Sequence, residues 1–173
     1  SVSMCPMGKD SFGPVVIHEG GGHGFGRLLD EYRYYAAELP SDDKNSIKSW
    51  RSKDPYYGYN LDLTGDRNKV HWAHYFDRPG YEAVSMYEGG CLYEYGVWRP
   101  EYISCMEDNR PYYNAPSREA IVRRIMRASG KTFNMEDFIS KDKIRSEKGA
   151  PQTRTDYVTE AFVPFAPPIR VER

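Results

Sequence analysis

The sequence predicts an α+β fold, made mainly of helices and loops with few short strands. Apolar residues recur at helical spacing from Pro14 to about Tyr35 and again over 117–129, whereas Tyr, Gly and apolar residues alternate over 86–113. Helical spacing and strict alternation are the two periodicities that separate helices from strands. With 173 residues the chain is long enough for one domain.

The first helix is expected to begin at Pro14, because proline suits a first helical position. Its apolar positions are Val15, Val16, Ile17, Leu28 and Leu29. Residues 1–13 are expected to lead into it as a loop or short strand. The following stretch, from Leu39 to Val70, is polar and contains Pro, Ser, Asp, Lys, Asn and Gly throughout. We expect a long irregular loop there, a feature that in a compact domain is usually functional.

A second helix is expected near residues 117–129, with Ser117 as its N-cap and Gly130 closing it. Its apolar stripe consists of Ile121, Val122, Ile125 and Met126. A short third helix is expected from Asn134 to about Ser140.

The C-terminal segment is rich in proline from Gly149 onward, and proline excludes a regular helix. The sequence is therefore divided into one domain over residues 1–150 and an extended tail over residues 151–173.

Charge and composition exclude several classes of partner. The net charge is −1 and the pI is near 6.4, so nothing favours nucleic acid or an anionic membrane. No apolar run approaches the roughly 18 residues of a membrane span. Ser1 to Asp10 lack the pattern of a signal peptide. Three cysteines, Cys5, Cys91 and Cys105, are too few for a disulfide scaffold and fit either one disulfide with a free thiol or three buried thiols.

The segment that indicates a chemistry begins with His18-Glu-Gly-Gly-Gly-His23 and continues to Asp30-Glu-Tyr32. The common zinc-peptidase motif places two histidines four positions apart on one helix face. Here they are five apart, which on an ideal helix leaves them roughly 140° from each other. A π-bulge, with its i→i+5 turn, would return both rings to one face. Three successive glycines suit such a distortion, although each weakens a helix by roughly 1 kcal/mol relative to alanine.

A catalytic zinc site keeps three protein ligands and one open position. His18 and His23 supply two of them. Gly24 and Gly26 let the chain turn sharply, so that Asp30 can fold back as the third. The neighbouring Glu31 is the alternative, either as the ligand or as a hydrogen-bond partner of a ligand histidine.

A more distant alternative for the third ligand is Glu88. Glu19 follows the first histidine and is expected to be the general base that takes a proton from the zinc-activated water. A phosphate-binding loop is the other use of so many glycines, but no G-K-[ST] follows and the glycines do not follow a strand.

The block from His18 to Tyr32 resembles the active-site signature of the bacterial IgA-peptidase family of metallopeptidases. Further similarities are Tyr87-Glu-Gly-Gly, Trp98-Arg-Pro and Ser104-Cys-Met106. The resemblance covers roughly residues 14–130. It implies a zinc endopeptidase, secreted or at the bacterial cell surface or periplasm, that acts on host glycoproteins such as immunoglobulins.

This family is similar to the metzincins, and Gly26 occupies the place of the glycine in their extended motif. The resemblance implies that Met106 forms the methionine turn beneath the zinc, and it supports Asp30 as the third ligand. The metzincin histidine ligand would fall at Leu29, so this sequence departs from that broader group. Metzincin-like domains place a sheet and a helix before the zinc helix. The sequence is thus expected to be the C-terminal portion of such a domain, partnered by an N-terminal part that precedes it.

Other residues have competing interpretations. His71 and His74, on an expected helical turn, are either a second metal site or ordinary partly buried residues, and we prefer the second. Arg99 is expected to make a structural ion pair and not to bind a substrate carboxylate. Tyrosines at 56–59 and 93–95 are expected to cover the core. The arginines expected on a solvated helix face are Arg118, Arg123, Arg124 and Arg127.

A non-catalytic protein- or carbohydrate-binding module, with a structural or vestigial zinc, is the alternative function. Its zinc would be closed by four protein ligands and would not need Glu19.

Overall fold

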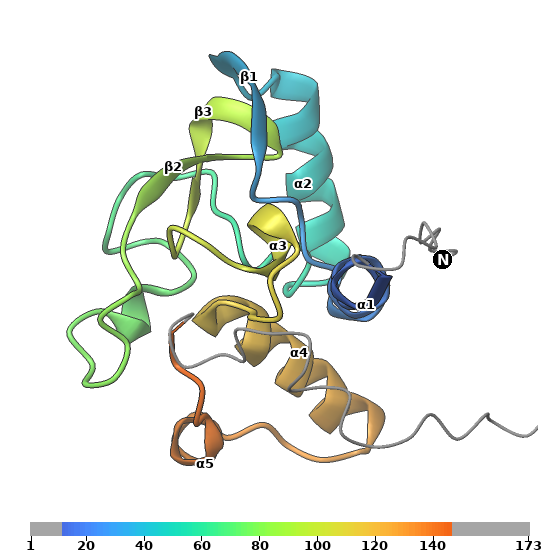
Figure 1. Cartoon of the computed structure of the whole chain (residues 1–173), viewed down its shortest axis with the longest axis vertical. Coiled ribbons are helices and arrows are strands. Elements are labelled where there is room, and N and C mark those ends of the chain that lie inside the picture. Colours follow the sequence, from blue (N-terminus) through green and yellow to red (C-terminus); the bar gives the residue numbers. More distant parts are fainter. Residues whose placement is uncertain (1–11, 147–173) are drawn as a thin grey trace, which may run out of the picture.

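The computed structural model describes residues 12–146, in which helices and three strands form an α+β arrangement (Figure 1). The expected tail over 151–173 and Cys5 lie outside the described residues. A small sheet and helix α2 (Ser41–Lys53) occupy one end of the molecule, and helices α4 (Ala115–Ala128) and α5 (Met135–Lys141) the other. The short helix α3 (Cys105–Asp108) lies between these two parts.

The chain enters through α1 (Phe12–Val16), which continues directly into a π-helix, η1 (Ile17–Gly26). The prediction that this helix reaches Tyr35 is wrong. It ends at Gly26, because Arg27 adopts the left-handed conformation with φ 52° and donates its backbone N–H to Gly22 O. Pro14 lies within the first turn, two residues after the helix begins.

The sheet has the strand order β1-β3-β2. Strand β1 (Arg33–Glu38) pairs in parallel with β3 (Leu92–Arg99), and β2 (Tyr87–Gly90) pairs with β3 in antiparallel fashion. Two of these strands lie within 86–113, where extended segments were predicted, and that prediction is confirmed. The first half of strand β1, as far as Tyr35, was expected to be helix, and that prediction is wrong.

Helix α2 contradicts part of the prediction of an irregular loop from Leu39 to Val70, whereas residues 54–70 form no helix or strand, as expected. The helix buries only Ile47 in full, so its sequence carries almost no apolar stripe. The feature of its sequence that favours a helix is the distribution of charged residues. Asp42 and Asp43 lie in the first turn, whereas Arg51 and Lys53 lie in the last, which complements the helix dipole at both ends.

The two C-terminal helices are close to prediction. Helix α5 has Asn134 as its N-cap, with the side chain accepting a hydrogen bond from Asp137 N. Helix α4 begins two residues before the expected start, and its N-cap is not Ser117 but Asn114, which accepts from Ser117 N. The cap lies earlier because Pro116, which suits the first helical turn, falls inside the helix.

The arginines of α4 do not form a solvated face. Arg118 pairs with Asp142 at 2.8 Å, Arg124 with Asp54 at 2.6 Å, and Arg123 with the buried Glu119 at 2.7 Å. Arg127 is exposed, as expected. The pairs with Asp142 and Asp54 tie α4 to other segments, which the local charge pattern cannot reveal, whereas Arg123 and Glu119 pair within the helix.

The buried apolar residues form three small clusters. The largest lies beneath α4 and α5 and consists of Val70, Trp72, Tyr75, Tyr81, Val84, Ala115 and Phe138. The second joins α2 to the sheet through Leu39, Ile47, Leu61 and Val97. The third comprises Leu28, Met106 and Ala120 and lies beside η1, with Tyr56, Tyr59 and Tyr113 packed against it. Tyr56 and Tyr59 therefore cover the core, as predicted, and Tyr93 packs against the second cluster, but Tyr95 is exposed and does not.

Within residues 12–146, no helix is both long and apolar enough to cross a membrane.

Candidate metal centre

Both motif histidines lie on η1 and face each other. In a π-helix the hydrogen bonds run from i to i+5, which places residues five apart on one face. His18 Nε2 lies 3.2 Å from His23 Nε2. The predicted i→i+5 geometry is confirmed, although it extends over all ten residues of η1 and is not confined to a single bulge.

Asp30 completes the group, because the chain reverses after Gly26. Its Oδ1 atom lies 3.0 Å from His18 Nε2 and 3.1 Å from His23 Nε2. These are the three side chains that the structure brings together as possible metal ligands. Had the helix continued, Asp30 would lie about 10 Å beyond His23 along the axis, out of reach of both rings.

The second nitrogen of each ring fixes the orientation of the histidine. His18 Nδ1 is 2.8 Å from Cys105 O, and His23 Nδ1 is 2.8 Å from Leu28 O. A carbonyl oxygen can only accept, so Nδ1 must carry the hydrogen in both rings. In the neutral histidines Nε2 is then an unprotonated atom whose lone pair is directed at the shared point.

The spacing of the three atoms agrees with a tetrahedral cation site. Ligands bound to zinc at about 2.0–2.1 Å lie about 3.3–3.4 Å from one another. The observed separations of 3.0–3.2 Å are within a few tenths of an ångström of this value. Two imidazole nitrogens and one carboxylate oxygen are also a donor set that zinc accepts. A single proton could form a hydrogen bond between only two of these atoms, whereas a metal ion can bind all three.

The charges in this cluster favour a cation as well. Burial opposes ionisation of Asp30, but hydrogen bonds from the protonated forms of His18 and His23 lower its pKa well below the usual range. The hydrogen bond to Asp30 raises the pKa of His23, and the negative charge of Glu19 adds to that shift. Glu19 therefore acts on the same centre, and its partly buried side chain follows His18 directly on η1.

Glu31, the alternative third ligand, points into the protein and is fully buried. Its carboxylate accepts hydrogen bonds from Asn60 Nδ2 at 2.7 Å, Asn114 Nδ2 at 2.6 Å and Ser104 Oγ at 2.7 Å. Burial raises the pKa of Glu31 to about 7, while these three donors and Arg99 act in the opposite direction. Glu31 thus holds the loop that carries Asp30 and is not placed to bind the same ion.

Met106 lies directly beneath η1 and is completely buried. A Cβ atom on Gly22 would collide with the Met106 thioether sulfur, so the helix and the methionine are in close contact. The residue before it, Cys105, provides the carbonyl that orients His18, and Met106 O accepts from Glu31 N at 2.8 Å. Met106 is therefore part of the floor under the ligands, at the place where the methionine turn was expected.

Replacing Gly22 with alanine is expected to destabilise this centre, because the new methyl group must displace the fully packed Met106. We expect a loss of about 1–3 kcal/mol in the free energy of unfolding, the usual cost of overpacking. Gly20→Ala is the matched control, since a Cβ there meets no atom within 4 Å. Urea unfolding of both variants tests the prediction, and an equal effect at the two positions would contradict it.

Tyr32 belongs to the site although no role was assigned to it from the sequence. Its ring stacks near His18, with centroids 6.3 Å apart. Burial, followed by the charge of Asp30 and a hydrogen bond to it, raises the pKa of Tyr32, so the phenol stays protonated. Its position at the end of the Asp30-Glu-Tyr motif is the sequence feature that could have indicated that Tyr32 belongs to the site.

Four other contributors come from distant parts of the sequence, namely Asn60, Ser104, Cys105 and Asn114. Ser104 and Cys105 belong to the Ser104-Cys-Met106 similarity, whereas no local pattern indicates Asn60 or Asn114.

The remaining candidates lie away from the centre. His71 Nδ1 is 2.8 Å from Asp62, and His74 Nε2 is 2.9 Å from Glu119, so each histidine has its own carboxylate and the two share no cluster with a third ligand in the described residues. Glu88 accepts a hydrogen bond from Gly96 N.

Arg99 is buried and donates to the carbonyls of Glu88 and Gly89, not to a carboxylate in an ion pair as predicted. Cys91 and Cys105 are free thiols.

No family model and no curated protein matches the sequence.

Proposed function

We propose that this protein is a zinc-dependent endopeptidase in which His18, His23 and Asp30 hold the ion and Glu19 is the general base. The observation that carries the proposal is the convergence of two unprotonated imidazole nitrogens and one carboxylate oxygen within 3.2 Å. Zinc bound there would supply an activated water and polarise the substrate carbonyl. This chemistry accounts for a π-helix whose glycines would otherwise only weaken it.

Glu19 and Tyr32 have separate roles in the proposed reaction. Glu19 adjoins His18 and influences the pKa of His23, so it lies within reach of a nucleophile at the centre. It takes the proton of the attacking water and returns it to the leaving amine. Tyr32 keeps its proton next to Asp30, and its O–H would turn from Asp30 to the oxyanion that develops in the transition state.

The ligand count favours catalysis over a structural role. A structural zinc site is closed by four protein ligands, whereas a catalytic site leaves one position open. In the described residues the cluster contains three possible ligands. A binding module with a closed zinc site would require a fourth.

The finer assignment rests on the motif. We propose that the chain belongs to a metzincin-like catalytic domain of the IgA-peptidase type, with Met106 as its methionine turn. On the same basis we propose a secreted or surface location and a glycoprotein substrate such as an immunoglobulin.

Zinc binding and peptide cleavage by the full chain test the proposal together. After treatment with chelator, the protein is expected to take up one zinc ion per chain and to generate new peptide termini from a mixed peptide library, as detected by mass spectrometry. Zinc at about 100 times its dissociation constant should stabilise the fold by about 2.7 kcal/mol. His18→Ala should lose both properties.

His74→Ala is the control for that experiment, since it removes a histidine that pairs with a carboxylate away from the centre. It should retain one zinc per chain. Equal zinc uptake by His18→Ala and the unchanged protein would contradict the proposed site.

A further inference from the structure

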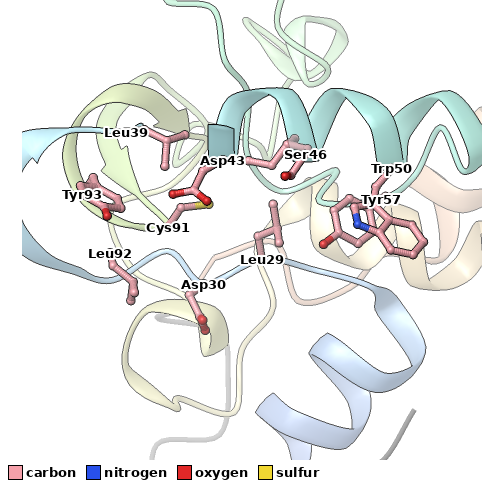
Figure 2. Close-up of a pocket in the computed structure, with 11 residues that line it drawn as sticks. Leu29, Asp30, Leu39, Asp43, Ser46, Trp50, Tyr57, Cys91, Leu92 and Tyr93 are labelled. Atoms are coloured by element: carbon pink, nitrogen blue, oxygen red, sulfur yellow. The ribbon is translucent and has the colours of Figure 1, made fainter. Parts of the chain in front are cut away.

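A cavity of about 350 Å³ opens beside the proposed metal ligands (Figure 2). Asp30 lies on its border, and the cavity extends from there between helix α2 and strand β3. Its volume is at the lower end of the range of about 300–1,000 Å³ that ligand pockets occupy. The space therefore suits one long side chain better than a large cofactor.

One face of α2 forms a wall of this cavity. Residues at i, i+3, i+4 and i+7 share a face of a helix, and here these positions are Asp43, Ser46, Ile47 and Trp50. Tyr57 lies at the same end as Trp50, and Leu29 lies nearer the middle (Figure 2). The rings of Trp50 and Tyr57 stack with centroids 5.7 Å apart and an interplanar angle of 24°.

The lining is apolar apart from a few groups, and its charge is negative. It includes the carboxylates of Asp30 and Asp43 and no lysine or arginine. Asp43 points toward Cys91 across the cavity (Figure 2). In the part of the chain that the structure describes, Asp43 has no hydrogen-bond or ion-pair partner. Trp50 is 47% exposed, and Lys53 Nζ lies 5.3 Å from its ring centroid, so its ring serves the cavity as an apolar wall.

We propose that this cavity is a subsite for a basic side chain, lysine or arginine, of a peptide whose scissile bond lies over His18, His23 and Asp30. The inference rests on the proposed function, because it names the class of peptide that the same site would cleave. Apolar walls, Trp50 among them, bury the methylene stem, and Asp43 pairs with the charged end. Since Asp30 borders both the ligand cluster and the cavity, a peptide over the cluster can place a neighbouring side chain inside.

Cleavage of a matched peptide series tests the inference. The full chain with zinc is given peptides that differ at one position, which is arginine, lysine or norleucine. We expect kcat/KM to favour the basic residues. Asp43→Asn should reduce the arginine-to-norleucine ratio by about 2- to 5-fold, the usual effect of losing an ion pair to an exposed carboxylate. Asp42→Asn, an equal charge change in the same helical turn outside the lining, should preserve it.

A binding measurement separates this inference from the proposed function. Acetyl-arginine amide and acetyl-norleucine amide are titrated into the Glu19→Gln variant labelled with fluorotryptophan, and the ¹⁹F resonance of Trp50 is identified with Trp50→Phe. We expect the arginine probe to shift this resonance, an effect lost in Asp43→Asn and kept in Asp42→Asn.

Arginine binding that depends on Asp43 without any cleavage would support the subsite and overturn the peptidase. Cleavage with no basic preference, or equal effects of Asp42→Asn and Asp43→Asn, would overturn the subsite and leave the peptidase intact. If neither cleavage nor arginine binding is observed, both proposals fail.

Discussion

Peptide hydrolysis by the Glu19→Gln variant is expected to be about 10²- to 10⁴-fold slower than that of the unchanged protein, the usual contribution of a general base. Glutamine has nearly the shape of glutamate but cannot take up a proton. Glu19 is not one of the three clustered ligands, so the variant should still bind one zinc ion. The measurement is kcat/KM on a cleaved peptide, accompanied by zinc content and thermal unfolding of the same sample.

The zinc content and the unfolding curve serve as internal controls for that variant. Unchanged values together with a large loss of kcat/KM assign Glu19 to the chemistry. Full activity in Glu19→Gln would show that Glu19 is not the general base. A parallel loss of zinc would mean that the residue helps to hold the ion.

The second large effect is expected at Glu31, a residue that supports the site without touching the ion. Its carboxylate accepts from Asn60, Ser104 and Asn114, and the last two are also the N-caps of α3 and α4. Glu31→Ala would leave three buried donors without this acceptor, at about 1–3 kcal/mol for each unpaired group. We expect a total loss of about 3–5 kcal/mol in the free energy of unfolding and weaker zinc binding, because Asp30 adjoins the cavity created.

Glu31→Gln is the matched variant for this prediction. Its oxygen can still accept from both asparagine amides, and its NH₂ group can donate to the Ser104 hydroxyl. It should therefore lose only about 1 kcal/mol, one ordinary hydrogen bond. Urea unfolding and zinc titration of the two variants give the comparison, and a Glu31→Ala protein as stable as Glu31→Gln would refute the role of the network.

The possible metal ligands could be named from the sequence because they are local. His18, His23 and Asp30 fall within 13 consecutive residues, and three glycines between the histidines already indicated an i→i+5 turn. Asp30 was preferred to Glu31, and it is Asp30 that lies against both rings. The N-cap of α5 could be predicted for the same reason, because Asn134 accepts its hydrogen bond from a residue of its own helical turn.

Features that depend on distant partners were not predictable in this way. The partners of Glu31 lie 29, 73 and 83 residues away, and nothing near Asn60 or Asn114 indicates that they meet. The arginines of α4 looked solvated because their carboxylate partners Asp54 and Asp142 are on other segments.

Helix α2 was missed for a different reason. It buries only Ile47 in full, so a method that searches for an apolar stripe finds none.

The central claim is that His18, His23 and Asp30 bind one common ion. Anomalous diffraction from crystals grown with zinc, recorded on both sides of the zinc absorption edge, tests it most directly. The account predicts one strong peak about 2.0–2.2 Å from His18 Nε2, His23 Nε2 and Asp30 Oδ1, with a position left open for water. A map with no peak between these atoms, or with the zinc held by other residues, would contradict it.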